Sequence, residues 1–366
     1  MRVIFKAYTK CRYNYTAEKS DIKGPCIILC NHTTTLDPFF VSLSFKMPLY
    51  FFASDDIFNI RGISPIIRYL VAPIPKSKSK ADMNAVRISL KVLKEGGAVA
   101  IFPEGNRTLS GRQWEMTDAV AKLVKLSKVP LVLYNIRGGY GTDPRWGLKL
   151  RKGKMRGAVV RVMQPQEYKE LDTAALFDTI CKELEVYDPD SGVKFKSRRR
   201  AENVERVLYM CPHCLAVSSI KSRKSGFACS ACGKRWEYTE DLHISPNDKF
   251  DAVDKWHDWE KQRVAELVRG GDGRLFYDGN IKFYESVRLK RKRKLDGRAV
   301  AADRDGITVI GKKGETRFAF GETDGFTILG KRKFNVYYGG KTFQVKGDKK
   351  FCPLKYLHLY EEVNNV

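Results

Sequence analysis

Short apolar runs alternate with longer amphipathic stretches along the first half of the chain. The runs Cys26–Cys30 and Ala98–Ile101 are almost uniformly apolar, which is typical of strands buried on both faces of a sheet. Apolar residues recur at helical spacing in Thr117–Ser127 and Thr173–Tyr187. This alternation predicts an α/β domain with a mixed sheet over residues 1–193.

The second half of the chain has a different pattern. From Gly273 onward, short runs rich in Phe, Tyr, Val and Ile alternate with turns that contain Gly and Asp, which predicts an antiparallel sheet. A charged helix capped by Ser245 is expected before this sheet, and a closing helix is expected at Pro353–Glu362. Strands followed by one helix loosely resemble a pleckstrin-homology-like domain, although no motif makes that resemblance specific. A basic junction precedes this half, so we expect three domains, at 1–193, 203–240 and 245–366.

Residues 2–13 predict a small amphipathic helix whose apolar stripe consists of Val3, Ile4, Ala7, Tyr8 and Cys11. Two interpretations remain open for this helix. It packs on the core of the domain, or it rests on the surface of an anionic membrane. No run of 18 apolar residues occurs, so no membrane-spanning helix is expected, and the first residues lack the continuous apolar core of a signal peptide.

The charge balance narrows the class of partner. The 366 residues include 67 Lys and Arg against 42 Asp and Glu, which gives a formal net charge of +25. Such an excess favours an anionic partner, whether nucleic acid, an acidic membrane surface or a phosphorylated substrate. The nine cysteines are too few and too scattered for a disulfide scaffold, which fits a reducing compartment.

Four of the nine cysteines form two CxxC pairs separated by 14 residues, namely Cys211, Cys214, Cys229 and Cys232. Four soft thiolates at this spacing predict a zinc ribbon with tetrahedral coordination. Because the protein fills all four positions, the metal is expected to be structural. His213 lies inside the first pair and is not needed as a ligand.

A histidine leaves the first buried strand, and a carboxylate follows five positions later. His32 is a candidate general base, and Asp37 can fix its tautomer and stabilise the imidazolium that forms after proton abstraction. A pair at this spacing also fits a structural role, so the pair alone does not identify an enzyme.

A second polar stretch, Phe102–Thr108, follows the second buried strand and reads FPEGNRT. With Asn31–Asp37, which reads NHTTTLD, it matches the two motifs NHxxxxD and FPEGTRS of the phospholipid-synthesis acyltransferases. The chain therefore resembles the 1-acylglycerol-3-phosphate acyltransferase family over roughly residues 1–190. The resemblance implies transfer of a fatty acyl chain from acyl-CoA or acyl carrier protein to the 2-hydroxyl of 1-acylglycerol 3-phosphate, which makes phosphatidate.

The resemblance also implies roles for individual residues. His32 and Asp37 would be catalytic, and the substrate-binding residues would be Glu104, Gly105, Arg107, Lys76 and Lys78. The two lysines stand where the family has an Arg that contacts the acceptor phosphate, which leaves the identity of the acceptor open. No metal is expected in the chemistry.

Other departures and alternatives accompany this hypothesis. The stretch Gly138–Gly141 is expected to be a loop, and without a GxGxxG spacing it is weak evidence for phosphate binding. The acceptor could instead be another lysolipid or alcohol. A nucleic-acid-binding zinc-ribbon protein is the less favoured alternative, because it does not explain the two motifs. The expected location is cytoplasmic and peripheral on the inner face of the cell membrane.

Overall fold

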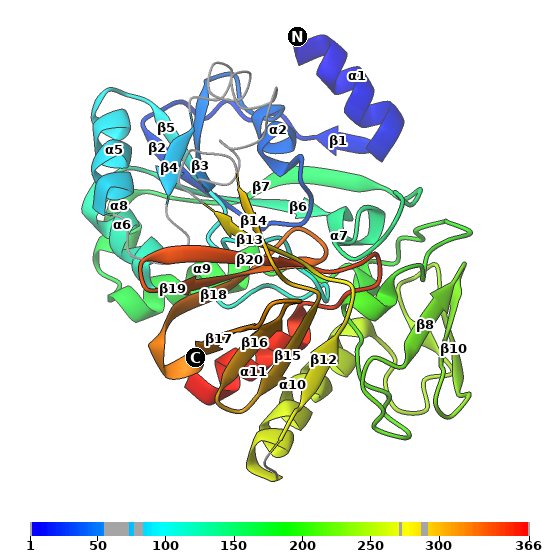
Figure 1. Cartoon of the computed structure of the whole chain (residues 1–366). Helices are drawn as coiled ribbons and strands as arrows, with labels where there is room; N and C mark the ends of the chain where they lie inside the picture. Colours follow the sequence, from blue (N-terminus) through cyan, green and yellow to red (C-terminus); the bar gives the residue numbers. More distant parts are fainter. Residues whose placement is uncertain (1, 55–72, 77–82, 271–272, 287–291, 365–366) are drawn as a thin grey trace. The chain divides into compact units, whose positions relative to one another are not determined.

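The structure, a computed structural model, describes residues 2–54, 73–76, 83–270, 273–286 and 292–364. These residues form two compact units, one made of 1–145 with 150–197 and the other of 146–149 with 198–366. Each unit has its own sheets and helices (Figure 1). Lys78, one of the predicted substrate-binding residues, lies outside the described residues.

The first unit is built on a seven-stranded sheet with the order β1-β7-β6-β2-β5-β3-β4. Parallel pairing joins the strands from β6 through β4, whereas β7 is antiparallel to β6, so the sheet is mixed as predicted. The edge strand β1 runs parallel to β7. The strands are β1 (Tyr15–Ala17), β2 (Cys26–Cys30), β3 (Leu49–Ser54), β4 (Ile74–Lys76), β5 (Ala98–Ile101), β6 (Leu131–Arg137) and β7 (Met155–Met163).

Both faces of this sheet are covered, because every residue of the central strand β2 is buried. Side chains alternate along a strand, so Ile27 and Leu29 join one core and Ile28 joins the other. The first core contains residues of α5, α6 and α9, and the second contains residues of α2. The helices of this unit are α1 (Arg2–Tyr13), α2 (Asp37–Ser42), α5 (Met83–Lys94), α6 (Ala119–Ser127), α7 (Gly139–Thr142), α8 (Pro165–Lys169) and α9 (Thr173–Leu184).

The sequence pattern located these elements closely, with one clear error. The strand predicted at Cys26–Cys30 matches β2, and the helix predicted over residues 2–13 is α1. The stretch Gly138–Gly141, predicted as a loop, instead contributes to the short helix α7. The prediction was wrong because glycine disfavours a helix by only about 1 kcal/mol, and tertiary contacts outweigh that preference.

The second unit begins with a four-stranded antiparallel sheet in the order β11-β10-β9-β8, and its strand β9 ends at Cys229, one of the four clustered cysteines. Its strands are β8 (Ile220–Arg223), β9 (Gly226–Cys229), β10 (Arg235–Tyr238) and β11 (Ile244–Ser245). Ser245 was predicted to cap a helix, but it pairs with Glu237 in the sheet and is therefore extended. The helix α10 begins later and spans Val253–Gly270.

The rest of the second unit contains two antiparallel sheets and a final helix, α11 (Leu354–Asn364). One sheet has the order β12-β15-β16-β17 and the other β14-β13-β20-β19-β18. The strands are β12 (Phe276–Asp278), β13 (Lys282–Ser286), β14 (Arg293–Leu295), β15 (Ala299–Asp303), β16 (Gly306–Ile310), β17 (Glu315–Ala319), β18 (Thr323–Leu329), β19 (Lys333–Tyr338) and β20 (Lys341–Lys346). Three 3₁₀ turns complete the described structure at Pro189–Ser191, Val204–Arg206 and Phe320–Glu322.

None of the helices in the described part of the chain combines the length and the apolar composition needed to cross a bilayer.

Candidate functional site

The two sequence motifs meet at the carboxyl ends of neighbouring strands. His32 follows β2 and Glu104 follows β5, and these two strands are parallel partners in the sheet. Parallel neighbours end at the same edge, so the loops after them lie side by side. Asn31 holds the first loop onto the other neighbour, β6, because its amide nitrogen donates to the Ile136 carbonyl and its amide oxygen accepts from the Ile136 N–H.

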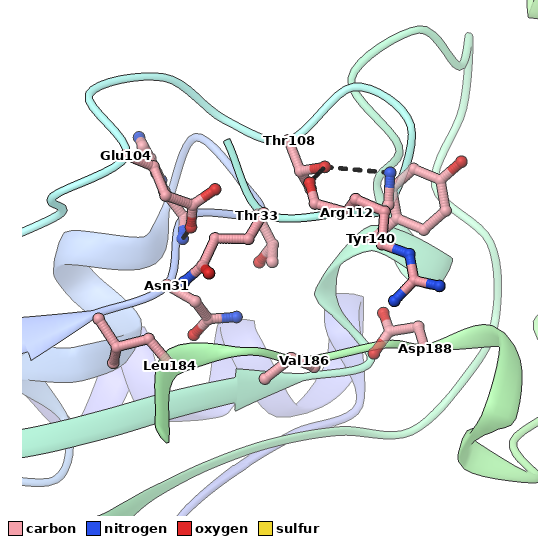
Figure 2. A pocket seen from close by; sticks show the side chains of 12 residues that line it. Asn31, Thr33, Glu104, Thr108, Arg112, Tyr140, Leu184, Val186 and Asp188 are labelled. Carbon is pink, nitrogen blue, oxygen red and sulfur yellow. Dashed lines mark hydrogen bonds between the residues drawn. The ribbon is translucent and has the colours of Figure 1, made fainter. Parts of the chain in front are cut away.

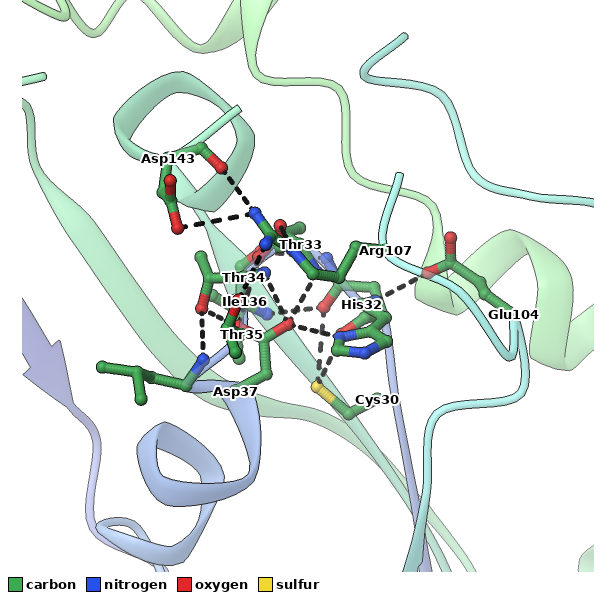
Figure 3. A network of polar contacts seen from close by, with 12 residues as sticks. Cys30, His32, Thr33, Thr34, Thr35, Asp37, Glu104, Arg107, Ile136 and Asp143 are labelled. Atoms are coloured by element: carbon green, nitrogen blue, oxygen red, sulfur yellow. Dashed lines mark hydrogen bonds and ion pairs between the residues drawn. The ribbon is translucent and has the colours of Figure 1, made fainter. Parts of the chain in front are cut away.

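His32 and Asp37 are in direct contact, with 2.8 Å between the imidazole Nδ1 and a carboxylate oxygen (Figure 3). Asp37 is the first residue of α2 and its side chain is fully buried. Its carboxylate also accepts the backbone N–H groups of Thr33 and Thr34 at 2.6 and 2.9 Å, and the Thr34 hydroxyl at 2.6 Å. These bonds hold the carboxylate in one orientation toward the imidazole.

The imidazole of His32 is in a state suited to accept a proton. Burial lowers the pKa of His32 below its usual value of about 6.5, and this outweighs the opposing effect of Asp37. The ring is therefore neutral near pH 7. When Nδ1–H donates to Asp37, the lone pair resides on Nε2. The ring also stacks on Phe102, with 4.5 Å between the ring centroids, and one-fifth of the side chain stays exposed.

Glu104 connects the second motif to the backbone of the first. Its two carboxyl oxygens accept the backbone N–H groups of His32 at 2.7 Å and Trp114 at 3.0 Å. The Thr108 N–H in turn donates to the His32 carbonyl at 2.9 Å. Both main-chain polar groups of His32 are thus bonded to the second motif, and burial raises the pKa of Glu104 to about 8.

Arg107 uses its guanidinium inside the protein. Nε donates to the Thr33 carbonyl at 3.1 Å, one Nη donates to the Thr35 hydroxyl at 2.8 Å, and the other bonds Asp143. The contact with Asp143 includes its backbone carbonyl at 3.0 Å and its carboxylate at 3.4 Å. Arg145 donates to the Arg107 carbonyl at 3.0 Å, and burial followed by repulsion from Arg107 lowers the pKa of Arg145 to about 9. Arg107 therefore clamps the loop that carries His32.

A small cavity lies between the two motifs and the start of α7 (Figure 2). Its volume is about 10 Å³, enough for one water molecule and too little for a lipid. On its far side the buried Asp188 accepts the N–H groups of Gly138 and Gly141 at 2.7 and 3.0 Å. The amides that a phosphate would need at this glycine-rich turn are therefore bonded to a carboxylate.

The remaining predicted residues are placed as follows. Gly105 has a φ of +65°, a left-handed conformation that favours glycine. Lys76 is the last residue of the edge strand β4. Sequence reasoning missed Asp143, Trp114 and Asp188, because no spacing rule links them to either motif. Their only sequence signal is that they follow a motif or a glycine-rich turn.

The four clustered cysteines form a separate site in the second unit. Their sulfur atoms all lie within 4.8 Å of one another, and two of the distances are 3.8 Å (Cys211 to Cys232) and 3.6 Å (Cys214 to Cys229). Tetrahedral Zn–S bonds of about 2.3 Å place the sulfur atoms about 3.8 Å apart. The donor set and its spacing can therefore hold a tetrahedral metal ion.

Known proteins with similar sequences belong to the enzyme class that the two motifs around His32 suggest. Residues 12–136 match the family model described as Acyltransferase, so the first unit carries a domain of this family and the chain is an enzyme of the acyltransferase class. The similar proteins are named 1-acyl-sn-glycerol-3-phosphate acyltransferases. One from Borreliella burgdorferi is 25% identical over 44% of this chain and 67% of that protein, and one from Bacillus subtilis is 23% identical over 43% and 76%.

Two further matches are more distant in coverage or shape. The chloroplastic 1-acyl-sn-glycerol-3-phosphate acyltransferase BAT2 of Brassica napus is 25% identical over 34% of this chain and 39% of that protein. The crystal structure of PlsC, the 1-acyl-sn-glycerophosphate acyltransferase of Thermotoga maritima, aligns with a TM-score of 0.39 and 21% identity. It covers 46% of this chain and 70% of that chain. All of these alignments leave more than half of the present chain unmatched.

Proposed function

We propose that the chain transfers a fatty acyl group from acyl-CoA or acyl carrier protein to the 2-hydroxyl of 1-acylglycerol 3-phosphate, producing phosphatidate. The observation that carries this proposal is the contact of 2.8 Å between His32 and the buried Asp37, beside the second motif. The names of the similar proteins support the same acceptor.

The proposed chemistry needs one base and no metal. The Nε2 atom of His32 takes the proton of the acceptor hydroxyl while the oxygen attacks the thioester carbonyl carbon. The tetrahedral intermediate then expels the thiol of the donor, which leaves with the proton held by His32. Asp37 stabilises the imidazolium between these two events. Glu104 and Arg107 fix the backbone on either side of His32, so the imidazole does not need to reorganise.

The phosphate of the acceptor has two candidate binding groups. Arg107 with Lys76 or Lys78 is the assignment that the family motif suggests. All three nitrogen atoms of Arg107 donate to protein oxygen atoms, so a phosphate would have to displace Asp143 or share its contact. If Arg107 reads the phosphate, Arg107→Ala raises the acceptor KM. If Arg107 only clamps the loop, the same change lowers kcat for acceptors with and without phosphate.

This occupied guanidinium also favours a second candidate acceptor. Because the Arg107 guanidinium is already bonded to the Asp143 carboxylate, the enzyme can act on another lysolipid or on an alcohol without phosphate. Purified protein should be assayed with lysophosphatidate, other lysolipids and a simple alcohol, each with both acyl donors. Efficient transfer to lysophosphatidate that is lost in His32→Ala supports the first candidate, and equal transfer to all acceptors supports the second.

We propose zinc as the metal of the four-cysteine site, with a structural role. The distances between the sulfur atoms support this, and the N–H of Ala231 lies 3.4 Å from the Cys229 sulfur, a contact that orients the thiolate. Elemental analysis should find one zinc ion per chain. The paired change Cys211→Ser with Cys229→Ser should lose it, while Cys352→Ser, at a buried cysteine outside the cluster, should keep it.

We further propose that the chain attaches peripherally to the inner face of the cell membrane, and that the two sheets with α11 form a pleckstrin-homology-like domain. Exposed apolar residues on α1 support the first proposal. The succession of nine antiparallel strands in two sheets before a single helix supports the second. Loss of vesicle binding when residues 2–13 are deleted would test the attachment.

A further inference from the structure

The first unit contains a wide basic groove that shares no lining residue with the cavity beside His32. Three segments distant in sequence line it: the end of α1 at residues 10–14, the loop 150–154 and the segment 192–196. Its volume is about 720 Å³. Its lining contains no Asp or Glu and seven basic residues, namely Lys10, Arg12, Arg151, Lys152, Lys154, Lys194 and Lys196.

The charges of the groove are not neutralised by the protein. Arg151 is buried and is left aside here. The other six basic residues form no ion pair with a carboxylate in the described part of the chain. Elsewhere in this unit basic side chains do pair, as Lys46 does with Asp21 and Lys122 does with Asp118, both at 2.7 Å. An unpaired cluster of cations on a concave surface attracts anions strongly.

The backbone holds these cations close together. Lys152 and Lys196 face each other in an antiparallel bridge, with N–H···O distances of 2.9 and 2.8 Å in the two directions. Like charges directly opposite each other destabilise such a pair. Phe195 is fully buried and packs so tightly on Gly153 that a Cβ there would lie 2.2 Å from the ring. The backbone of these two segments is therefore tightly packed. It holds two lysines opposite each other, although the repulsion between their charges destabilises the folded state.

The groove continues the apolar stripe of α1. Val3, Ile4 and Tyr8 on this helix are 80%, 76% and 48% exposed. Cys11 belongs to the same stripe, because it lies seven residues after Ile4, and it also lines the groove. Exposed apolar side chains beside unpaired cations are the combination that binds the interface of an anionic bilayer.

We propose that this groove binds the phosphate groups of anionic membrane lipids while the stripe of α1 enters the apolar layer. The inference rests on the proposed function, because an enzyme that takes a lysolipid must reach the bilayer. It adds a headgroup site formed by the loop 150–154 and the segment 192–196. The apolar stripe favours a lipid over an acidic carrier protein, which would need only the charges.

The test compares two triple variants of the full chain that lose the same charge. The groove variant is Lys152→Gln with Lys154→Gln and Lys196→Gln. The matched control is Lys94→Gln with Lys122→Gln and Lys182→Gln, on helices that do not line the groove. Binding is measured by co-sedimentation with vesicles of phosphatidylcholine, with and without phosphatidylglycerol.

The expected result is a roughly 100-fold loss of affinity for the phosphatidylglycerol vesicles in the groove variant, from about a fivefold loss for each of the three charges removed. The control variant should change by less than tenfold, and neither should bind pure phosphatidylcholine better than the wild type. Equal losses in the two variants would overturn the proposal, because only net charge would then matter. Added glycerol phosphate that releases the wild type from vesicles at low concentration would also overturn it, since the site would then prefer a free phosphate.

Two further measurements separate this proposal from the proposed function. The groove variant should acylate a water-soluble, short-chain lysophosphatidate at the wild-type rate, and its thermal unfolding should be unchanged or at higher temperature. His32→Ala should bind vesicles as the wild type does. Loss of short-chain turnover in the groove variant, or loss of carrier-protein docking with intact vesicle binding, would contradict the lipid site even if the acyltransferase assignment holds.

Discussion

The loop around His32 and the basic groove differ in how their polar and charged side chains are bonded. Around His32, Asp37, Glu104 and Arg107 are each bonded to several protein atoms at 2.6–3.4 Å. In the groove, six basic side chains have no carboxylate partner in the described structure. A paired network fixes geometry, as a catalytic base requires. Cations without a carboxylate partner can instead attract an anion from outside the protein.

Removing the proposed base, His32, should have the largest effect on turnover. We expect His32→Ala to lower kcat by at least about 10²–10⁴-fold, because the acceptor hydroxyl loses its proton acceptor. Steady-state turnover is measured together with thermal unfolding, and His213→Ala in the second unit is the control. A folded His32→Ala protein with near-normal turnover would exclude the mechanism. The groove triple variant should keep the wild-type turnover of a water-soluble, short-chain lysophosphatidate.

Removing the charge that orients the base should have the next largest effect. Asp37→Asn keeps the shape of the residue but cannot stabilise the imidazolium, and one of its Thr33 and Thr34 contacts must weaken. We expect kcat to fall by about 10²–10⁴-fold, within the range known for general acid–base groups. Asp21→Asn, at an exposed ion pair, is the control. A change of less than tenfold in Asp37→Asn would show that the buried carboxylate is only structural.

Opening the clamp on the loop should cost less. Arg107→Ala removes the bonds to Thr33, Thr35 and Asp143, and we expect kcat/KM to fall about 10–100-fold, the cost of misplacing a catalytic group. Asp143→Asn keeps the backbone contact and should lose less than tenfold. A rise in KM confined to phosphate-bearing acceptors would instead assign Arg107 to the phosphate.

The pH profile should show the smallest but most specific effect. Because the neutral imidazole is active and its pKa is lowered, kcat/KM should rise with pH and level off, with a midpoint below about 6.5. Asp37 raises the pKa of His32 and Arg107 lowers it. The midpoint should therefore move down in Asp37→Asn and up in Arg107→Ala. Identical midpoints in all three proteins would mean that another group controls the profile.

The sequence by itself predicted the local elements and the candidates for the reacting groups. Uniform apolar runs predicted β2 and β5 because a strand inside a sheet has no polar face. The motif spacing brought His32 and Asp37 together, since four intervening residues span one tight loop and the start of α2. The spacing of the two CxxC pairs predicted the cysteine cluster in the same way. In each case the partners are close along the chain, so pattern and composition suffice.

Only the tertiary structure decided what the charged residues do. The family motif suggested Glu104 as a substrate-binding residue, and in the structure its carboxyl oxygens accept the backbone N–H groups of His32 and Trp114. Arg107 donates a hydrogen bond to Asp143, which is 36 positions away in the sequence. Lys152 forms an antiparallel bridge with Lys196, which is 44 positions away. A charge is satisfied by whatever the fold brings within about 4 Å, and that neighbour depends on strand order rather than on local pattern. The sequence therefore showed that the chain is strongly basic, and the fold decided which of those charges have a carboxylate partner among the described residues.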